Sequence, residues 1–149
     1  MDNSNHISTL NSLIETLKDG EEGFRTAAEG LTNPQTKALF QQYSQERAQM
    51  ARELQQEVRA LGGDPEKAGS VSGSVHRGWI NIKSAVTGKN DASIISEAER
   101  GEDVAKKAYE EAAKASLPPS ASAIVAQQAI KVRAAHDRVR SLERAVTTH

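Results

Sequence analysis

The chain has 149 residues, of which 26% are charged and none is cysteine, and its formal net charge is −1. The absence of cysteine excludes disulfides, thiolate metal sites and cysteine nucleophiles, and the nearly balanced charge provides no electrostatic footprint for nucleic acid. Hydrophobic residues make up 37% and aromatic residues only 3%, a balance typical of helices that pack through aliphatic and small side chains. We therefore expect a single all-α domain over residues 1–149.

Two features of the sequence favour a cytoplasmic protein. The N-terminal residues are polar and lack the basic-then-apolar order of a signal peptide. No apolar run approaches the ~20 residues that are needed to span a bilayer. We expect neither a membrane nor a nucleic acid as a partner.

The first half of the chain predicts two long helices, over residues 6–30 and 34–61. The second helix restarts at Asn33 and Pro34, a capping residue followed by proline at the first helical position. It stops at the Gly-Gly-Asp-Pro sequence of residues 62–65. Because the connection between the two helices is short, they must form an antiparallel hairpin.

Two glycines interrupt the first helix, Gly20 and Gly23. Each disfavours the helix by roughly 1 kcal/mol relative to alanine. They indicate either the close approach of a neighbouring helix or space around a carboxylate such as Glu21.

The second half predicts a short helix over residues 74–87 and long helices over residues 91–116 and 121–145. A Leu-Pro-Pro-Ser sequence at residues 117–120 separates the last two. The middle segment is long enough to carry the chain from one end of a bundle to the other. That connectivity would be ferritin-like, with two hairpins joined by a crossover. The rival arrangement is a simple up-and-down bundle with the short helix packed outside.

Three polar residues fall within apolar helical stripes: Glu21, Glu102 and Gln128. A bare carboxylate in an apolar interior costs several kcal/mol unless a proton, a partner or a metal satisfies it. The two carboxylates therefore predict a buried ion pair, a metal site, or a stripe that is exposed at that level. For the ion pair, Arg47 is the expected partner of Glu21, because counting back from the turn at ~1.5 Å per residue places both at one level.

The metal hypothesis assigns Glu21, Glu46 and Glu102 as carboxylate ligands and His136 as the nitrogen ligand. Recurrent inward carboxylates are how di-iron sites are built in helical bundles, and iron or manganese would suit such ligands. The Glu-x-x-His pairs of those sites are absent at every histidine. The competing interpretation of His136 is a satisfied histidine at the edge of the core.

The remaining candidates are structural or serve recognition. Arg47 and Gln128 are expected to form a polar core, since a buried polar residue sets helix register. Trp79 is expected to anchor the short helix on the bundle. A third hypothesis makes His76 and Trp79 an anchor for a protein partner. We assign no catalytic residue.

Four sequence motifs carry a resemblance: Asp-Gly-Glu-Glu-Gly-Phe at 19–24, Gly-Ser at 69–70, His-Arg-Gly-Trp at 76–79 and Glu-Ala-Glu-Arg-Gly-Glu-Asp at 97–103. With them, the chain resembles an uncharacterised bacterial four-helix-bundle family, a domain of unknown function in the ferritin-like superfamily. The resemblance implies a ferritin-like bundle. Better-known relatives in that superfamily bind two irons and oxidise or store them, but this chain lacks their Glu-x-x-His pairs.

The sequence thus predicts a cytoplasmic, stress-associated structural or binding protein with a degenerate metal site. We expect it to self-associate through exposed helix faces. The alternative is a di-metal carboxylate protein that uses iron or manganese for oxygen or peroxide chemistry.

Overall fold

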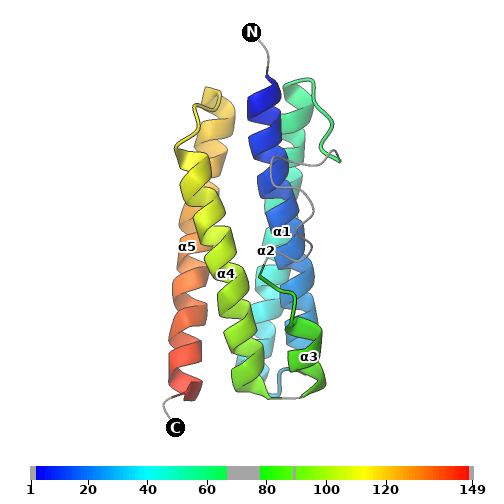
Figure 1. Cartoon of the computed structure of the whole chain (residues 1–149), viewed down its shortest axis with the longest axis vertical. Coiled ribbons are helices and arrows are strands. Elements are labelled where there is room, and N and C mark those ends of the chain that lie inside the picture. The colour runs from blue at the N-terminus through cyan, green and yellow to red at the C-terminus, as the bar shows by residue number, and fades with distance from the viewer. Residues whose placement is uncertain (1–2, 67–77, 89, 148–149) are drawn as a thin grey trace.

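The structure is a computed structural model that describes residues 3–66, 78–88 and 90–147. Four long helices form a bundle (Figure 1): α1 (Ser4–Gly30), α2 (Pro34–Ala60), α4 (Asp91–Ala113) and α5 (Pro119–Thr147). The short helix α3 (Ile82–Thr87) lies against its side. The prediction of an all-α fold is confirmed over the described residues. None of the helices in these ranges is both long enough and apolar enough to cross a membrane.

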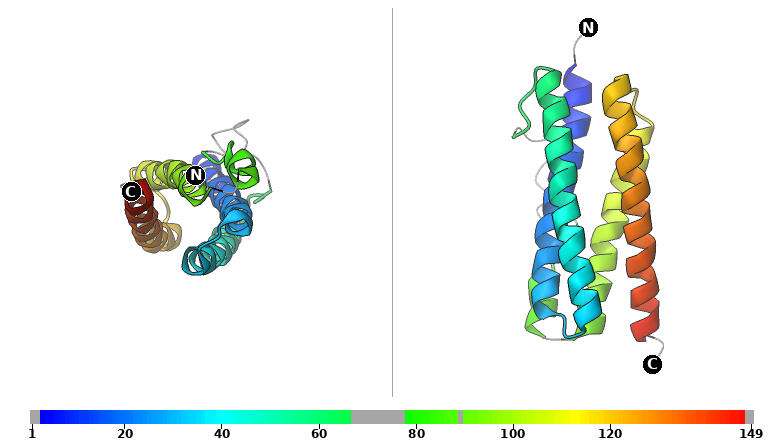
Figure 2. Two further views of the ribbon diagram at one scale, coloured as in Figure 1. Left: turned by 90° about the horizontal axis from the view of Figure 1, so that it is seen from below. Right: turned by 180° about the vertical axis from the view of Figure 1, so that it is seen from behind.

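The long helices are arranged as two antiparallel hairpins. α2 ends at the same end of the bundle as the N-terminus, whereas α4 begins beside α3 at the opposite end, so α2 and α4 run in the same direction (Figure 1). α1 packs against α2 and α4, and α5 packs against α4 and α2. Seen end-on, α2 and α4 therefore occupy diagonal corners (Figure 2). α3 contacts α1 and α4.

The start of α2 follows the sequence closely. The side-chain oxygen of Asn33 accepts hydrogen bonds from the backbone N–H groups of Gln35 at 2.9 Å and Thr36 at 3.1 Å. Pro34 then occupies the first turn, where its missing N–H needs no partner. These local interactions explain why the predicted restart is correct.

Asp91, the first residue of α4, ties the two hairpins together. Its carboxylate accepts hydrogen bonds from the backbone N–H groups of Thr32 at 2.9 Å and Asn33 at 3.1 Å, and from the Thr32 hydroxyl at 3.0 Å. The start of the second hairpin is thereby held on the turn of the first. The sequence did not predict this contact.

Several helix boundaries differ from the prediction. α1 begins at Ser4 instead of residue 6, α2 ends at Ala60 instead of residue 61, and α5 ends at Thr147 instead of residue 145. α4 ends at Ala113 instead of residue 116, and α5 begins at Pro119 instead of residue 121, because proline suits a first helical position. α3 begins at Ile82 instead of residue 74. Residues 74–77 lie outside the described residues, and Gly78, with a φ of 91°, has a left-handed backbone that does not continue into a helix.

The buried apolar side chains form two clusters, one toward each end of the bundle. Prominent members are Leu13, Leu17, Leu54 and Tyr109 in the first cluster, and Phe24, Phe40, Trp79 and Val139 in the second. Between the two clusters, each of α2, α4 and α5 contributes one buried polar residue. These residues are Arg47 on α2, Glu102 on α4 and His136 on α5. We call these three residues the polar layer.

Candidate functional site

The centre of the polar layer is an ion pair between Arg47 on α2 and Glu102 on α4. The distances are 2.7 Å from Arg47 Nη1 to Glu102 Oε1 and 2.6 Å from Nη2 to Oε2. Arg47 is 1% exposed and Glu102 is 0% exposed. Two parallel charge-assisted hydrogen bonds of this kind are among the stronger polar interactions in proteins. The pair crosses the diagonal of the bundle and connects the two hairpins.

Arg47 remains charged despite its burial. Burial by itself would lower the pKa of Arg47, but the charge and hydrogen bonds of Glu102 raise this pKa above its ordinary value. The phenyl ring of Phe24 also faces the guanidinium, with 5.3 Å between the ring centroid and Arg47 Cζ. An aromatic face at this distance attracts a cation.

Gly20 on α1 makes room for the guanidinium. A Cβ atom at Gly20 would lie 3.2 Å from Arg47 Nη1, closer than an ordinary van der Waals contact. The sequence interpretation, which allowed either a neighbouring helix or a carboxylate beside this glycine, missed the arginine.

The predicted partner of Arg47 was wrong. Glu21 is half-buried on α1, and its backbone carbonyl accepts a hydrogen bond from the Ser44 hydroxyl at 2.7 Å. Through this contact Glu21 lies beside Ser44 of α2, close to the level of Arg47, as the residue count predicted. The guanidinium nevertheless pairs with Glu102, which projects from the diagonal helix into the same interior.

The proposed metal ligands are engaged elsewhere or lie apart. Arg47 occupies both oxygens of Glu102, both ring nitrogens of His136 contact aspartates, and Glu21 and Glu46 are only half-buried. Among the residues that the structure describes, no three histidine, aspartate or glutamate side chains are grouped so that they could hold a metal ion. The residues of the polar layer therefore do not fit a di-metal site, because a guanidinium lies where a cation would bind.

His136 lies where α5 meets α4 and is 2% exposed. Its Nε2 atom is 2.7 Å from Asp103 Oδ1, and its Nδ1 atom is 3.1 Å from Asp137 Oδ1. The side chain of Asp103 is 61% exposed and that of Asp137 is 65% exposed. Sequence reasoning missed both aspartates, although Asp103 follows Glu102 directly and Asp137 follows His136.

Gln128 joins three helices, as expected of a polar core residue. Its side-chain oxygen accepts a hydrogen bond from the Tyr109 hydroxyl at 2.7 Å. Its amide nitrogen donates to the backbone carbonyl of Met50 at 3.1 Å and to Glu53 at 2.9 Å. Burial raises the pKa of Tyr109, so this hydroxyl remains a hydrogen-bond donor at neutral pH.

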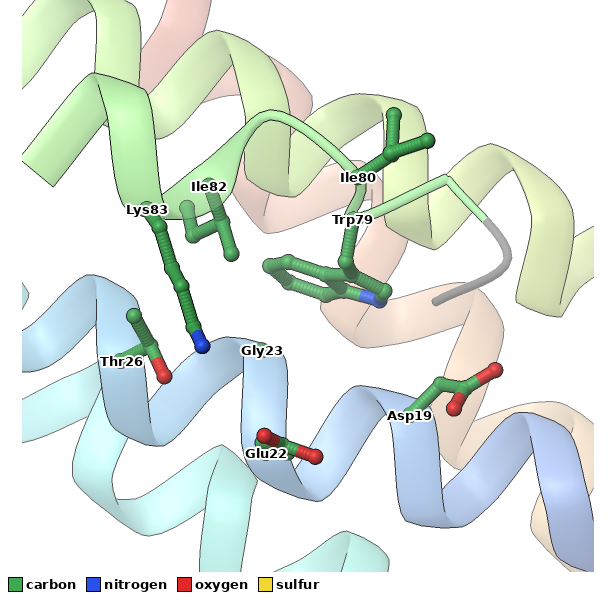
Figure 3. A pocket seen from close by; sticks show the side chains of 8 residues that line it. All are labelled: Asp19, Glu22, Gly23, Thr26, Trp79, Ile80, Ile82 and Lys83. Atoms are coloured by element: carbon green, nitrogen blue, oxygen red, sulfur yellow. The ribbon is translucent and has the colours of Figure 1, made fainter. Parts of the chain in front are cut away.

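Trp79 fills a slot between α1 and α4 (Figure 3) and is 3% exposed. A Cβ atom at either Gly23 or Gly101 would overlap the indole ring. The ring of Phe24 meets the indole edge-on, with 4.9 Å between centroids. At Gly78, a Cβ atom would come within 2.8 Å of the Gly101 Cα, so this glycine allows the chain to approach α4 closely. The motifs at residues 19–24, 76–79 and 97–103, which lie far apart in the sequence, thus meet at the indole of Trp79.

These contacts change the interpretation of Trp79. The indole anchors its segment on the bundle as predicted, but from the turn before α3 rather than from within a helix. Because it points inward, it is not accessible to a protein partner, and this part of the partner-anchor prediction is wrong. His76, the other proposed anchor, lies outside the described residues.

A small cavity lies beside the indole (Figure 3), with a volume of about 70 Å³. Asp19, Glu22, Thr26 and Lys83 line its polar side. Sites for drug-sized ligands are typically larger, at roughly 300–1,000 Å³. The cavity is therefore too small for a substrate of that size.

Comparison with known proteins gives a family but no activity. No curated protein matches the chain. Residues 5–115 match a family described as a domain of unknown function, DUF2383. The match spans both sides of the Arg47–Glu102 pair and the Trp79 slot, and it ends before α5. Since it covers most of the sequence, the chain belongs to the DUF2383 family.

Proposed function

We propose that this protein is a non-enzymatic bacterial member of the ferritin-like superfamily with a degenerate metal site. In this proposal it is a cytoplasmic, stress-associated structural or binding bundle. The supporting observation is the bidentate pairing of Arg47 with Glu102 at the centre of the bundle. Here the guanidinium provides the positive charge that a metal ion provides in bundles with inward carboxylates.

The charge of Arg47 opposes metal binding at Glu102. A buried carboxylate needs a compensating charge, and Glu102 already has one on both of its oxygens. A metal ion bound to Glu102 would have to displace Arg47 and leave the guanidinium buried without a partner. That displacement opposes metal binding.

The shape of the molecule favours binding through its surface. The cavity beside Trp79 is small, and the larger hollows, one between α1 and α2 and one between α3 and α4, are shallow grooves open to solvent. Ile80 and Ile130 are 69% and 71% exposed. We therefore propose that the partner is a macromolecule, with self-association as the first case to test. Light scattering over a range of protein concentrations measures self-association, and a constant monomer mass would contradict that case.

The metal content of the purified protein tests the central proposal. The protein would be loaded anaerobically with ferrous iron or with manganese, desalted, and subjected to elemental analysis. Wild-type protein and Glu102→Gln should both retain less than stoichiometric metal. Glu110→Gln, an exposed position on the same helix, is the matched control.

The alternative hypothesis, a di-metal carboxylate protein, predicts that the wild type retains metal. Stoichiometric iron or manganese in the wild type, lost in Glu21→Ala and Glu102→Gln but kept in the control, would overturn the proposal. The protein would then be a di-metal carboxylate protein, and oxidation of ferrous iron by oxygen or peroxide would be the activity to measure.

A further inference from the structure

α2 and α5 together form one side of the bundle, which we call the α2–α5 face. The two helices lie next to each other when the molecule is seen from behind (Figure 2). They pack against each other more loosely than any other adjacent pair of long helices. They have 27 and 29 residues, so the face is about 40 Å long. With two helices of about 10 Å diameter, it offers about 800 Å², the area that a standard protein interface buries on each partner.

The α2 edge of this face is acidic. The side chain of Glu53 marks the edge, because it accepts a hydrogen bond from the Gln128 amide of α5 at 2.9 Å. Glu46 lies two turns before Glu53 and therefore on the same side of α2. Both glutamates are half-buried. Leu39 lies two turns before Glu46 and is also half-buried, packed against the second apolar cluster.

The α5 edge is basic. Lys131 follows Gln128 by about one turn, and Arg138 follows Lys131 by two turns. Both cations are exposed, and within the described parts of the chain neither forms an ion pair. Leu142 lies one turn beyond Arg138 and is half-buried against the second apolar cluster. Each edge thus carries two like charges two turns apart, followed by a leucine.

The opposite charges of the two edges lie at matching levels. α2 and α5 run antiparallel (Figure 1), and the bond between Gln128 and Glu53 fixes their relative height. Counted from this bond, Lys131 lies about 4.5 Å beyond Glu53, and Arg138 lies about 4.5 Å beyond Glu46. Helical side chains point toward the N-terminus of their own helix, so these long side chains close the offset. Glu53 therefore shares a level with Lys131, and Glu46 shares a level with Arg138.

This pattern is complementary to itself about one kind of two-fold axis. An axis parallel to the helices keeps every residue at its own level and places α2 of one copy against α5 of the other. The acidic edge of each copy then meets the basic edge of its partner, and the same contact occurs twice. An axis across the helices would place α2 against α2 and α5 against α5, where like charges repel.

We propose that the α2–α5 face binds a second copy of this chain about a two-fold axis parallel to the bundle. In this dimer the glutamates of each copy lie opposite the cations of the other. The half-buried side chains of Leu39 and Leu142 are covered at one end of the contact. The inference rests on the self-association proposed above and names the surface that performs it.

Two charge-reversed variants test this arrangement. Glu46→Arg places cations opposite each other at both contacts of the dimer, and Arg138→Glu places carboxylates there. Each variant alone should raise the dissociation constant of the dimer by at least about tenfold, because juxtaposed like charges oppose binding. An equimolar mixture of the two variants should dimerise as tightly as the wild type, since both contacts of the mixed dimer again join opposite charges. Analytical ultracentrifugation over a range of concentrations measures the masses.

The matched controls reverse a charge away from the α2–α5 face. Glu110→Arg changes an exposed residue of α4, and Arg133→Glu changes an exposed residue of α5. Arg133 lies about 140° around the helix from Arg138, so it points away from α2. Both controls should dimerise like the wild type. Circular dichroism shows whether each variant keeps its helices.

Disulfide cross-linking provides a second measurement that does not depend on reversed charges. The chain has no cysteine, so a single introduced thiol reacts only with another introduced thiol. Oxidation of a mixture of Glu46→Cys and Arg138→Cys should give a covalent dimer, whereas neither variant alone should do so. A covalent dimer from either variant alone would overturn the arrangement.

The outcomes separate this inference from the proposed function. A wild-type dimer that both charge reversals leave intact, or a mixture that fails to recover dimerisation, would overturn the α2–α5 interface while self-association stands. A wild type that stays monomeric at all concentrations would overturn the interface together with the proposed self-association. The metal content of the protein decides the degenerate metal site independently of either result.

Discussion

Breaking the Arg47–Glu102 pair should destabilise the protein far more than removing the pair altogether. Arg47→Met deletes the guanidinium and leaves the Glu102 carboxylate at 0% exposure with no compensating charge. Leaving a buried charge in this state costs about 3–5 kcal/mol. Small domains are stable by only about 5–15 kcal/mol, so the variant should lose a large fraction of its free energy of unfolding.

The double variant separates the worth of the pair from the penalty of an orphaned charge. Arg47→Met with Glu102→Leu replaces two buried charges by apolar side chains, a change that is often neutral or stabilising by about 1–4 kcal/mol. We expect the double variant to be close to the wild type or more stable. The coupling free energy between the two sites should therefore be at least about 3 kcal/mol.

Urea denaturation at neutral pH, followed by circular dichroism of the helices, measures these free energies. Arg52→Met is the matched control, because Arg52 lies on the same helix, is exposed and hydrogen bonds only to Gln49 among the described side chains. It should change stability by less than about 0.5 kcal/mol. The reasoning would be refuted if Arg47→Met were as mild as this control. It would also be refuted if the double variant were no more stable than Arg47→Met.

Two further variants test how the bundle is held together. Gly23→Ala should destabilise the protein, although alanine favours a helix by about 1 kcal/mol, because the new methyl group overlaps the buried indole of Trp79. The single tryptophan should then fluoresce at longer wavelength, whereas Gly88→Ala, with no atom closer than 3.5 Å to its added Cβ, should leave both stability and emission unchanged. Gln128→Leu strands the Tyr109 hydroxyl and should reduce the free energy of unfolding by about 1–3 kcal/mol, measured by the same denaturation. An unchanged urea midpoint would contradict this prediction and would mean that a water molecule bonds to the Tyr109 hydroxyl in place of the Gln128 side chain.

Interactions between residues close in sequence made most of the fold predictable. The spacing of apolar residues identified the four long helices, and Asn33 with Pro34 identified the start of α2, because a capping contact spans only a few residues. The same stripes showed that Glu102 and Gln128 point inward, since a helix fixes the face of each side chain. The structure places both residues in the interior.

The partners of these inward groups depended on tertiary structure. Arg47 could have paired with Glu21 on the neighbouring helix, but its bond goes to Glu102 across the diagonal. The spacing of apolar residues gives only the approximate direction of a side chain around its helix. It cannot predict which of two carboxylates at a similar level along the bundle pairs with the arginine. Packing of the two hairpins makes that choice.

The glycines illustrate the same division. The sequence showed that Gly20 and Gly23 weaken α1, and it required a compensating contact. Only the folded chain reveals that the compensating groups are the guanidinium of Arg47 and the indole of Trp79, which come from α2 and from the turn before α3. Local propensity is determined by the residues of one helix, whereas the group that fills a space depends on segments distant in sequence. The sequence by itself therefore determined the helices and their inward faces, and the tertiary structure decided which groups meet between them.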